Sequence, residues 1–153
     1  MAEKNPTAKK TRTESTDEVQ KNILIVEDDD LLRNSIFRFL KRLGYNVQAV
    51  ENGFEALLLL QYRQPDLIIT DIRMPKLGGL SMAEGLKNRP ETRDIPLILI
   101  TAQREDNYYK RARELGAYFF ILKPFTLSDL NKKIGALFKY AEMKKQRTKK
   151  QGK

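Results

Sequence analysis

Five short apolar runs, each followed by a segment with helical spacing, constrain this chain more than any other feature of its sequence. The runs lie at residues 23–26, 45–50, 67–70, 96–100 and 118–122. Short apolar runs of this kind are typical of parallel strands that are buried on both faces of a sheet. The intervening helices then cover those faces. The pattern predicts an α/β fold built around a doubly wound, five-stranded parallel sheet.

The helical segments carry signals for their ends. After the first run, Leu32 and Ile36 lie on one helix face, and Gly44 is placed to end that helix. Thr126 and Asp129 form a capping pair at the start of the last helix. We expect helices at about 32–43, 52–65, 80–87, 105–115 and 127–137.

The length of 153 residues suits one domain with tails. Residues 1–20 and 141–153 lack apolar periodicity, and we therefore expect both to be disordered. The net charge of +9 is concentrated at one end, because residues 139–153 hold seven Lys or Arg and one Glu, whereas residues 22–138 hold 17 against 15 acidic residues. The predicted domain, residues 21–140, is thus almost neutral.

The composition excludes several kinds of chemistry. The chain has no Cys and no His, so thiolate or imidazole metal sites and triads with an imidazole base are ruled out. The N-terminal residues contain no apolar stretch typical of a signal peptide, and no run of 18 uncharged apolar residues occurs. We expect no membrane span and a cytoplasmic location.

Polar residues follow four of the five predicted strands. Asp28 and Asp29 follow the first strand, Asp71 ends the third, Thr101 ends the fourth and Lys123 ends the fifth. Ligands of doubly wound sheets bind at the carboxyl ends of the strands. These side chains should therefore converge at one edge of the sheet.

The carboxylates at this edge predict a metal site. Glu27, Asp28, Asp29 and Asp30 are consecutive, and Asp71 lies across the predicted crevice. Several carboxylates this close repel unless a divalent cation neutralises them, and oxygen ligands suit Mg²⁺ or Mn²⁺. Alternatively, an aspartate can cap a helix, and we favour that role for Asp29 and Asp30.

Asp71 is our candidate nucleophile, because an aspartate can attack a phosphoryl group and form an acyl phosphate. Asp66 begins the same strand and lies at the opposite edge. The Thr101 hydroxyl and the Lys123 ammonium could each bind a phosphoryl oxygen, which is what phosphoryl transfer requires. Taken alone, Thr101 could simply form a local hydrogen bond, and Lys123 could simply be a solvated surface charge.

Residues 21–140 resemble the receiver domains of bacterial response regulators. The family's acidic pair corresponds to Glu27 and Asp28 in ILIVEDDD, and its phosphoacceptor to Asp71 in LIITDIRMP. Its hydroxyl residue corresponds to Thr101 in LILITA, and its lysine to Lys123 in LKPF. The successive intervals are 43 residues from Asp28 to Asp71, 30 from Asp71 to Thr101 and 22 from Thr101 to Lys123, as in such domains.

The resemblance implies a flavodoxin-like (βα)₅ fold with strand order 2-1-3-4-5. It also implies that Asp28 and Asp71 bind Mg²⁺ directly, that Arg73 contributes its backbone carbonyl, and that Glu27 acts through a water. The phosphoryl group would come from a phosphohistidine of a histidine kinase or phosphotransfer protein. The domain would assist its own phosphorylation and dephosphorylation without being an enzyme acting on a separate substrate.

In the family, the signal passes through a hydroxyl and an aromatic residue, here Thr101 and Phe120, to the surface of the fourth helix, fifth strand and fifth helix. Phe120 lacks the phenol of a Tyr, so an inward state would rest on packing. Phe120 could equally be a core aromatic of the last strand. Arg73 and Gln103 flank the expected path of an attacking water and could tune the lifetime of the phosphoryl group.

Other functions have to be weighed against this one. An aspartate-nucleophile phosphatase would need a second Asp two residues after the first, where Arg73 stands. A receiver-like adaptor without phosphorylation would not need the full set of site residues. We expect no DNA-binding or enzymatic domain after residue 140, and therefore expect output through an unknown protein partner. A phosphorylation-linked homodimer is one form this could take.

The basic tail offers a further alternative, because its lysines could bind nucleic acid or an acidic membrane. It lacks interleaved aromatic residues and a helical apolar face. We therefore interpret it as a solvated basic extension of the last helix and do not expect nucleic acid as a partner.

Overall fold

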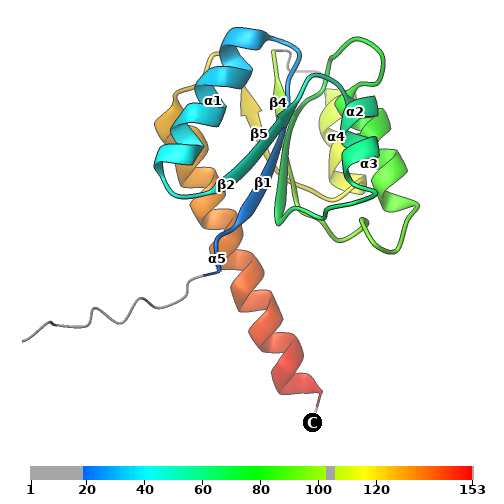
Figure 1. Cartoon of the computed structure of the whole chain (residues 1–153). Coiled ribbons are helices and arrows are strands. Elements are labelled where there is room, and N and C mark those ends of the chain that lie inside the picture. Colours follow the sequence, from blue (N-terminus) through cyan, green and yellow to red (C-terminus); the bar gives the residue numbers. More distant parts are fainter. Residues whose placement is uncertain (1–18, 103–105, 153) are drawn as a thin grey trace, which may run out of the picture.

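The computed structural model describes residues 19–102 and 106–152. Five parallel strands and five helices alternate along the chain (Figure 1). The strands are β1 (Asn22–Val26), β2 (Asn46–Val50), β3 (Leu67–Asp71), β4 (Leu97–Thr101) and β5 (Ala117–Leu122). The helices are α1 (Asp30–Arg42), α2 (Gly53–Leu59), α3 (Gly79–Lys87), α4 (Asp106–Glu114) and α5 (Leu127–Gln151).

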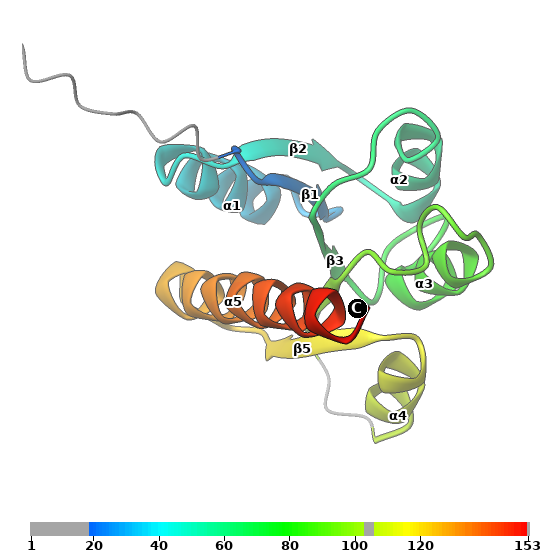
Figure 2. The ribbon, with the colours of Figure 1, turned by 90° about the horizontal axis from the view of Figure 1, so that it is seen from below.

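The strands lie in the order β2-β1-β3-β4-β5, which confirms the predicted topology. Helices α1 and α5 cover one face of the sheet, and α2, α3 and α4 cover the other (Figure 2). The three layers follow from the apolar runs, because a strand with two buried faces needs helices on both sides.

Side chains of each strand alternate between two cores. Ile23 and Ile25 pack in the core beneath α1 and α5, whereas Leu24 and Val26 pack in the core beneath α2 and α3. All four side chains are buried. Alternate residues of a strand point to opposite faces, so a continuous apolar run serves both layers.

The helix ends largely agree with the predicted signals. The Thr126 side chain accepts a hydrogen bond of 3.0 Å from the Asp129 amide at the start of α5. Asp29 caps α1 by accepting a bond of 2.8 Å from the Leu32 amide. Gly44 follows α1 with a φ of +95°, a conformation that a residue with a Cβ rarely adopts. One end differs, since α2 stops at Leu59 instead of continuing to the residues before Pro65, where the proline disfavours helix.

The C-terminal segment was predicted to be disordered, and this prediction was wrong. Helix α5 continues to Gln151, and its last turns extend beyond the body of the domain (Figure 1). Residues 141–151 consist mostly of Ala, Glu, Met, Lys, Arg and Gln, which all favour helix, and the next Gly is Gly152. Because Leu130, Ile134 and Leu137 already anchor the helix, each further residue adds a helical hydrogen bond without a new nucleation step.

Within the described residues, no helix is long and apolar enough to span a membrane. The disorder predicted for residues 1–20 falls almost entirely outside the described residues, as does the side chain of Gln103.

Candidate functional site

Two neighbouring strands bring the predicted carboxylates together. In the β1–β3 ladder Val26 pairs with Thr70, so that Glu27 and Asp71 come next to each other at the carboxyl edge of the sheet. Ligand oxygens of Glu27, Asp28 and Asp71 lie within 4.8 Å of one another. Glu27 is 1% exposed and Asp71 6% exposed, whereas Asp28 faces solvent. The convergence predicted from the sequence is therefore present.

Lys123 reaches this cluster from the loop after β5. Its Nζ donates to Asp71 Oδ2 at 2.5 Å and to Glu27 Oε1 at 3.2 Å. The Lys123 amide donates to the Thr101 carbonyl at 2.8 Å, which ties the end of β5 to the end of β4. The peptide bond between Lys123 and Pro124 is cis. One ammonium thus bridges two carboxylates whose repulsion would otherwise be unscreened.

Electrostatics in this cluster are dominated by burial. Burial and the nearby Asp71 carboxylate raise the pKa of Glu27 to about 7, although Lys123 opposes the shift. Burial by itself lowers the pKa of the Lys123 ammonium, but its hydrogen bond and charge attraction to Asp71, with a further contribution from Glu27, raise that pKa above its usual range. The cluster holds more negative charge than a single lysine neutralises.

The residues present fit a hard divalent cation. Among the described residues, Glu27 Oε2 is the buried side-chain oxygen that lacks a hydrogen-bond partner. An orphaned carboxylate oxygen beside two more carboxylates is a donor set of the kind that Mg²⁺ and Mn²⁺ prefer. The Arg73 amide donates to Asp71 Oδ1 at 3.0 Å, which holds the Arg73 backbone close to the same carboxylate.

The loop after β3 is folded tightly against the phosphoacceptor candidate. The Gly79 amide donates to the Ile72 carbonyl at 2.9 Å. A Cβ placed on Gly79 would lie 2.2 Å from the Asp71 carbonyl oxygen. Only a residue without a side chain fits there, so the LGG sequence that opens α3 also sets the backbone around Asp71.

Thr101 is buried at the end of β4, and its neighbour Ile100 pairs with Asp71 in the β3–β4 ladder. Phe120 is partly buried in β5 and packs with the small cluster of Ile72, Leu99 and Ala112. Thr101 therefore lies on the strand next to Asp71, and Phe120 packs in a cluster that includes Ile72 after Asp71 and Ala112 of α4. Their roles in switching stay predictions, as does the role of Gln103.

Sequence reasoning missed the two tyrosines of α4. The Arg73 guanidinium lies over the Tyr108 ring at 5.6 Å and donates to its hydroxyl at 3.3 Å. Tyr109 makes an edge contact with Phe120, with ring centroids 4.7 Å apart. Both contacts join residues that are far apart in the sequence, and the only local signal was a pair of aromatics in an otherwise polar helix.

Comparison with known proteins assigns this chain to one family. Residues 23–135 match the response regulator receiver domain. The chain is 33% identical over 120 residues to the phosphate regulon transcriptional regulatory protein PhoB of Rhizobium meliloti, covering 78% of this chain and 53% of that protein. It is 36% identical over 120 residues to the transcriptional regulatory protein CrdR of Helicobacter pylori, covering 78% and 56%. The chain thus spans about half the length of these relatives.

Solved structures agree with this assignment. The receiver domain of a signal transduction histidine kinase from Syntrophus aciditrophicus is 37% identical, with a TM-score of 0.70 over 76% of this chain and 89% of that one. A CheY-like receiver domain protein from Methanospirillum hungatei is 28% identical, with a TM-score of 0.76 over 82% and 98%.

A receiver domain from a sensor histidine kinase of Pseudomonas aeruginosa is also similar, at 28% identity and a TM-score of 0.67 over 74% of this chain and 93% of that one. It carries a magnesium ion in its active-site cleft. With the match over residues 23–135, the strand order and the carboxylate cluster, this chain belongs to the response regulator receiver domains of two-component systems.

Proposed function

We propose that the chain is a phosphorylation switch in which Asp71 accepts a phosphoryl group from a phosphohistidine. The donor would be a histidine kinase or a histidine phosphotransfer protein. The observation that carries the proposal is the position of Asp71, which ends a buried strand between the Lys123 ammonium, 2.5 Å away, and the carboxylates of Glu27 and Asp28.

In the transfer step, a carboxylate oxygen of Asp71 forms a bond to phosphorus while the phosphorus–nitrogen bond to the histidine breaks. The bonding electrons leave with the imidazole, and an acyl phosphate remains on Asp71. Lys123, which now binds the carboxylate, would turn its ammonium to a phosphoryl oxygen, and the Thr101 hydroxyl would donate to another. Each group neutralises charge where the transferred oxygens lie.

Asp28, Asp71 and the Arg73 carbonyl would hold Mg²⁺ directly, with Glu27 acting through a water, and Mn²⁺ has the same ligand preferences. The ion would neutralise charge between the carboxylates and the incoming phosphoryl oxygens. The orphaned Oε2 of Glu27 and the magnesium ion in the Pseudomonas aeruginosa receiver domain support this part of the proposal.

The output would pass through the face formed by α4, β5 and α5. Phe120 belongs to β5 in that face and packs on Tyr109 of α4, and it also contacts the cluster that contains Ile72, the residue after Asp71. Because Arg73 contacts Tyr108, a shift of the loop after β3 would be transmitted to α4. A downstream protein, or a second copy of the chain, would bind the altered face. The chain would act as a phosphoacceptor and not as an enzyme with a separate substrate.

Intact-mass measurement tests the proposal. Wild-type protein incubated with Mg²⁺ and acetyl phosphate or phosphoramidate should gain one phosphoryl group, and chelation of Mg²⁺ should prevent this. Asp71→Ala should gain none. Asp66→Asn is the matched control, because Asp66 flanks the opposite end of the same strand and should leave the adduct intact. No adduct on the wild type would favour an unphosphorylated receiver-like adaptor, and an adduct on Asp71→Ala would contradict the assignment of Asp71 as the phosphoacceptor.

A further inference from the structure

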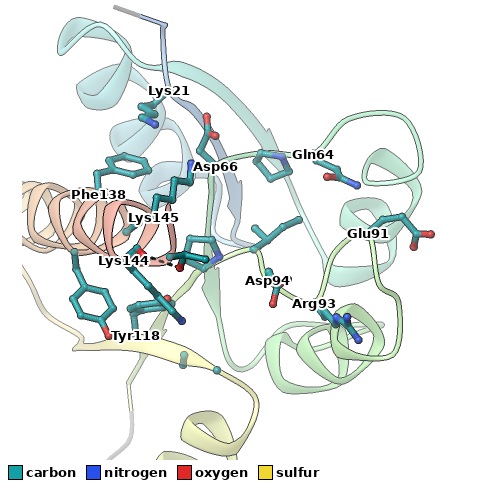
Figure 3. A pocket seen from close by; sticks show the side chains of 18 of the residues that line it. Lys21, Gln64, Asp66, Glu91, Arg93, Asp94, Tyr118, Phe138, Lys144 and Lys145 are labelled. Atoms are coloured by element: carbon teal, nitrogen blue, oxygen red, sulfur yellow. Dashed lines mark hydrogen bonds between the residues drawn. The ribbon is translucent and has the colours of Figure 1, made fainter. Parts of the chain in front are cut away.

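A groove of about 1120 Å³ lies on the side of the molecule away from Asp71. Its walls are the C-terminal turns of α5, the segments that precede β3 and β4, and the start of β5. These wall segments comprise residues 64–66, 90, 91, 93–96 and 116–118 (Figure 3). The groove exists because α5 continues past the edge of the sheet. It is separate from the carboxylate cluster, which lies at the carboxyl ends of the strands.

Cationic side chains outnumber carboxylates in the lining of the groove. Lys144, Lys145 and Lys149 come from α5, and Lys144 and Lys145 extend from the helix into the groove (Figure 3). Lys21, Lys87 and Arg93 line the other walls, against the carboxylates of Asp66, Glu91 and Asp94. Asp66 accepts a bond of 2.8 Å from the Asn22 amide and keeps its negative charge, so the lining holds six cationic side chains against three carboxylates. The groove is thus positive and would attract a polyanion.

Aromatic rings lie beside these lysines. Tyr118 of β5 and Tyr140 of α5 make an edge contact with centroids 5.7 Å apart, and they remain 36% and 54% exposed. Phe138 lies in the same groove, with the Lys21 ammonium 5.6 Å from its ring centroid. In the sequence the basic tail lacks interleaved aromatics, but folding places a tyrosine from β5 next to it.

We propose that this groove binds single-stranded nucleic acid. Lysines that follow a backbone of phosphates, together with exposed rings on which bases stack, are the combination by which proteins bind single strands without reading sequence. A duplex keeps its bases inside and would use only the lysines. An acidic protein surface would likewise satisfy the charges and leave the rings unused. The tyrosine pair therefore favours a single strand over both.

A second copy of the chain fits the extension of α5 poorly. The buried stripe of α5 continues beyond Leu137 as Ala141, Lys144, Thr148 and Gln151. A coiled coil needs apolar residues at these positions. Two such helices would also bring the same excess of positive charge together, which opposes their pairing.

Binding is tested with the full chain and a fluorescent oligonucleotide of about 15 nucleotides and mixed sequence, as RNA and as DNA. Lys144→Gln/Lys145→Gln removes two charges from the groove. Arg147→Gln/Lys150→Gln removes two charges from the same helix segment outside the groove and is the matched control. Circular dichroism verifies that both variants keep the helix.

We expect the groove pair to weaken binding at least about tenfold and to lower the slope of log K against log salt by about 1.4, since each phosphate contact contributes about 0.7 for a single strand. The control pair should change the affinity less than about threefold. Equal losses in the two pairs would overturn the proposal, because diffuse attraction to the helix would then explain the binding.

The rings are tested separately. Tyr140→Ala should weaken binding at least about fivefold, and Tyr140→Phe should not, because stacking needs the ring and not the hydroxyl. Tyr62→Ala is the control, since Tyr62 is 85% exposed and lies outside the groove lining. Binding of duplex DNA or polyglutamate as tightly as the single strand would overturn the proposal, the latter in favour of an acidic protein partner.

Asp71→Ala should bind the oligonucleotide within about twofold of the wild type, because the groove lies away from the phosphoacceptor. A failure of the phosphorylation proposal would therefore leave this measurement unchanged.

Discussion

At the scale of single residues, Glu27 has the most unusual environment for a carboxylate in this site. It is 1% exposed, and one of its two carboxylate oxygens has no hydrogen-bond partner among the described residues. A buried carboxylate in this position keeps its proton to a higher pH than usual. The free energy of unfolding of the metal-free protein should therefore depend on Glu27.

We predict that this free energy falls as the pH rises from about 4.5 to about 7. In that window folded Glu27 still binds a proton that the unfolded chain has lost, so a rising pH favours the unfolded state. The loss should be on the order of 2–3 kcal/mol. Urea denaturation of wild type and Glu27→Gln across this range measures it, because the variant lacks the titrating group. Identical pH profiles for the two proteins would contradict the prediction.

Lys123 has the complementary role, because its ammonium contacts both the Asp71 and the Glu27 carboxylates and offsets part of their charge. Lys123→Gln should lower the free energy of unfolding of the metal-free protein at pH 8 by about 2–4 kcal/mol, since it leaves buried carboxylates without their cation. Mg²⁺ should recover part of this loss by binding the same carboxylates. Lys139→Gln, an exposed position on α5, is the control, and equal stability of the two variants would argue against the assigned role.

At the scale of elements, the start of α3 and the end of β3 form one unit. Gly79 has no room for a side chain because the Asp71 carbonyl occupies that space. Gly85, in the same helix, would place a Cβ at an ordinary distance of 3.7 Å from Leu57. The two glycines thus differ in what surrounds them and not in the helix they belong to.

Gly79→Ala should lower the free energy of unfolding by about 2 kcal/mol or more and slow phosphorylation, since the backbone around Asp71 must move. Gly85→Ala should be neutral or stabilising by up to about 1 kcal/mol, because alanine favours a helix interior. Thermal unfolding together with the rate of phosphoryl incorporation separates the two. A Gly79→Ala protein with wild-type stability and rate would show that the loop adapts freely.

At the scale of the whole molecule, one sheet serves two cores. Leu24 and Ile25 are neighbours in β1 and fill opposite layers. A cavity in either layer therefore weakens the same strand and the same folding unit.

Leu24→Ala and Ile25→Ala should each lower the free energy of unfolding by about 2–5 kcal/mol, because each leaves a cavity in a packed core. Each variant should still unfold in a single transition. Far-ultraviolet and near-ultraviolet circular dichroism during urea unfolding test this, since the first follows the backbone and the second the tyrosines. Separate midpoints for the two signals would mean that the layers unfold independently.

The sequence by itself determined the sheet, its order of elements and the residues at its functional edge. Apolar runs such as residues 67–70 can be recognised in the sequence because a strand that is buried on both faces has few polar residues. Asp71 and Lys123 could be placed at one edge because the ends of parallel strands meet there. The helix caps at Asp29 and Thr126 were predictable because their hydrogen bonds span only three residues.

Only the tertiary structure decided how these parts meet. The contacts of Arg73 with Tyr108 and of Tyr109 with Phe120 depend on how α4 packs on β5, which no local pattern encodes. The length of α5 was underestimated because a segment that buries little can still be helical when a packed helix precedes it. The groove beside Tyr118 could not be predicted either, because its walls are distant in sequence and only the fold brings them together.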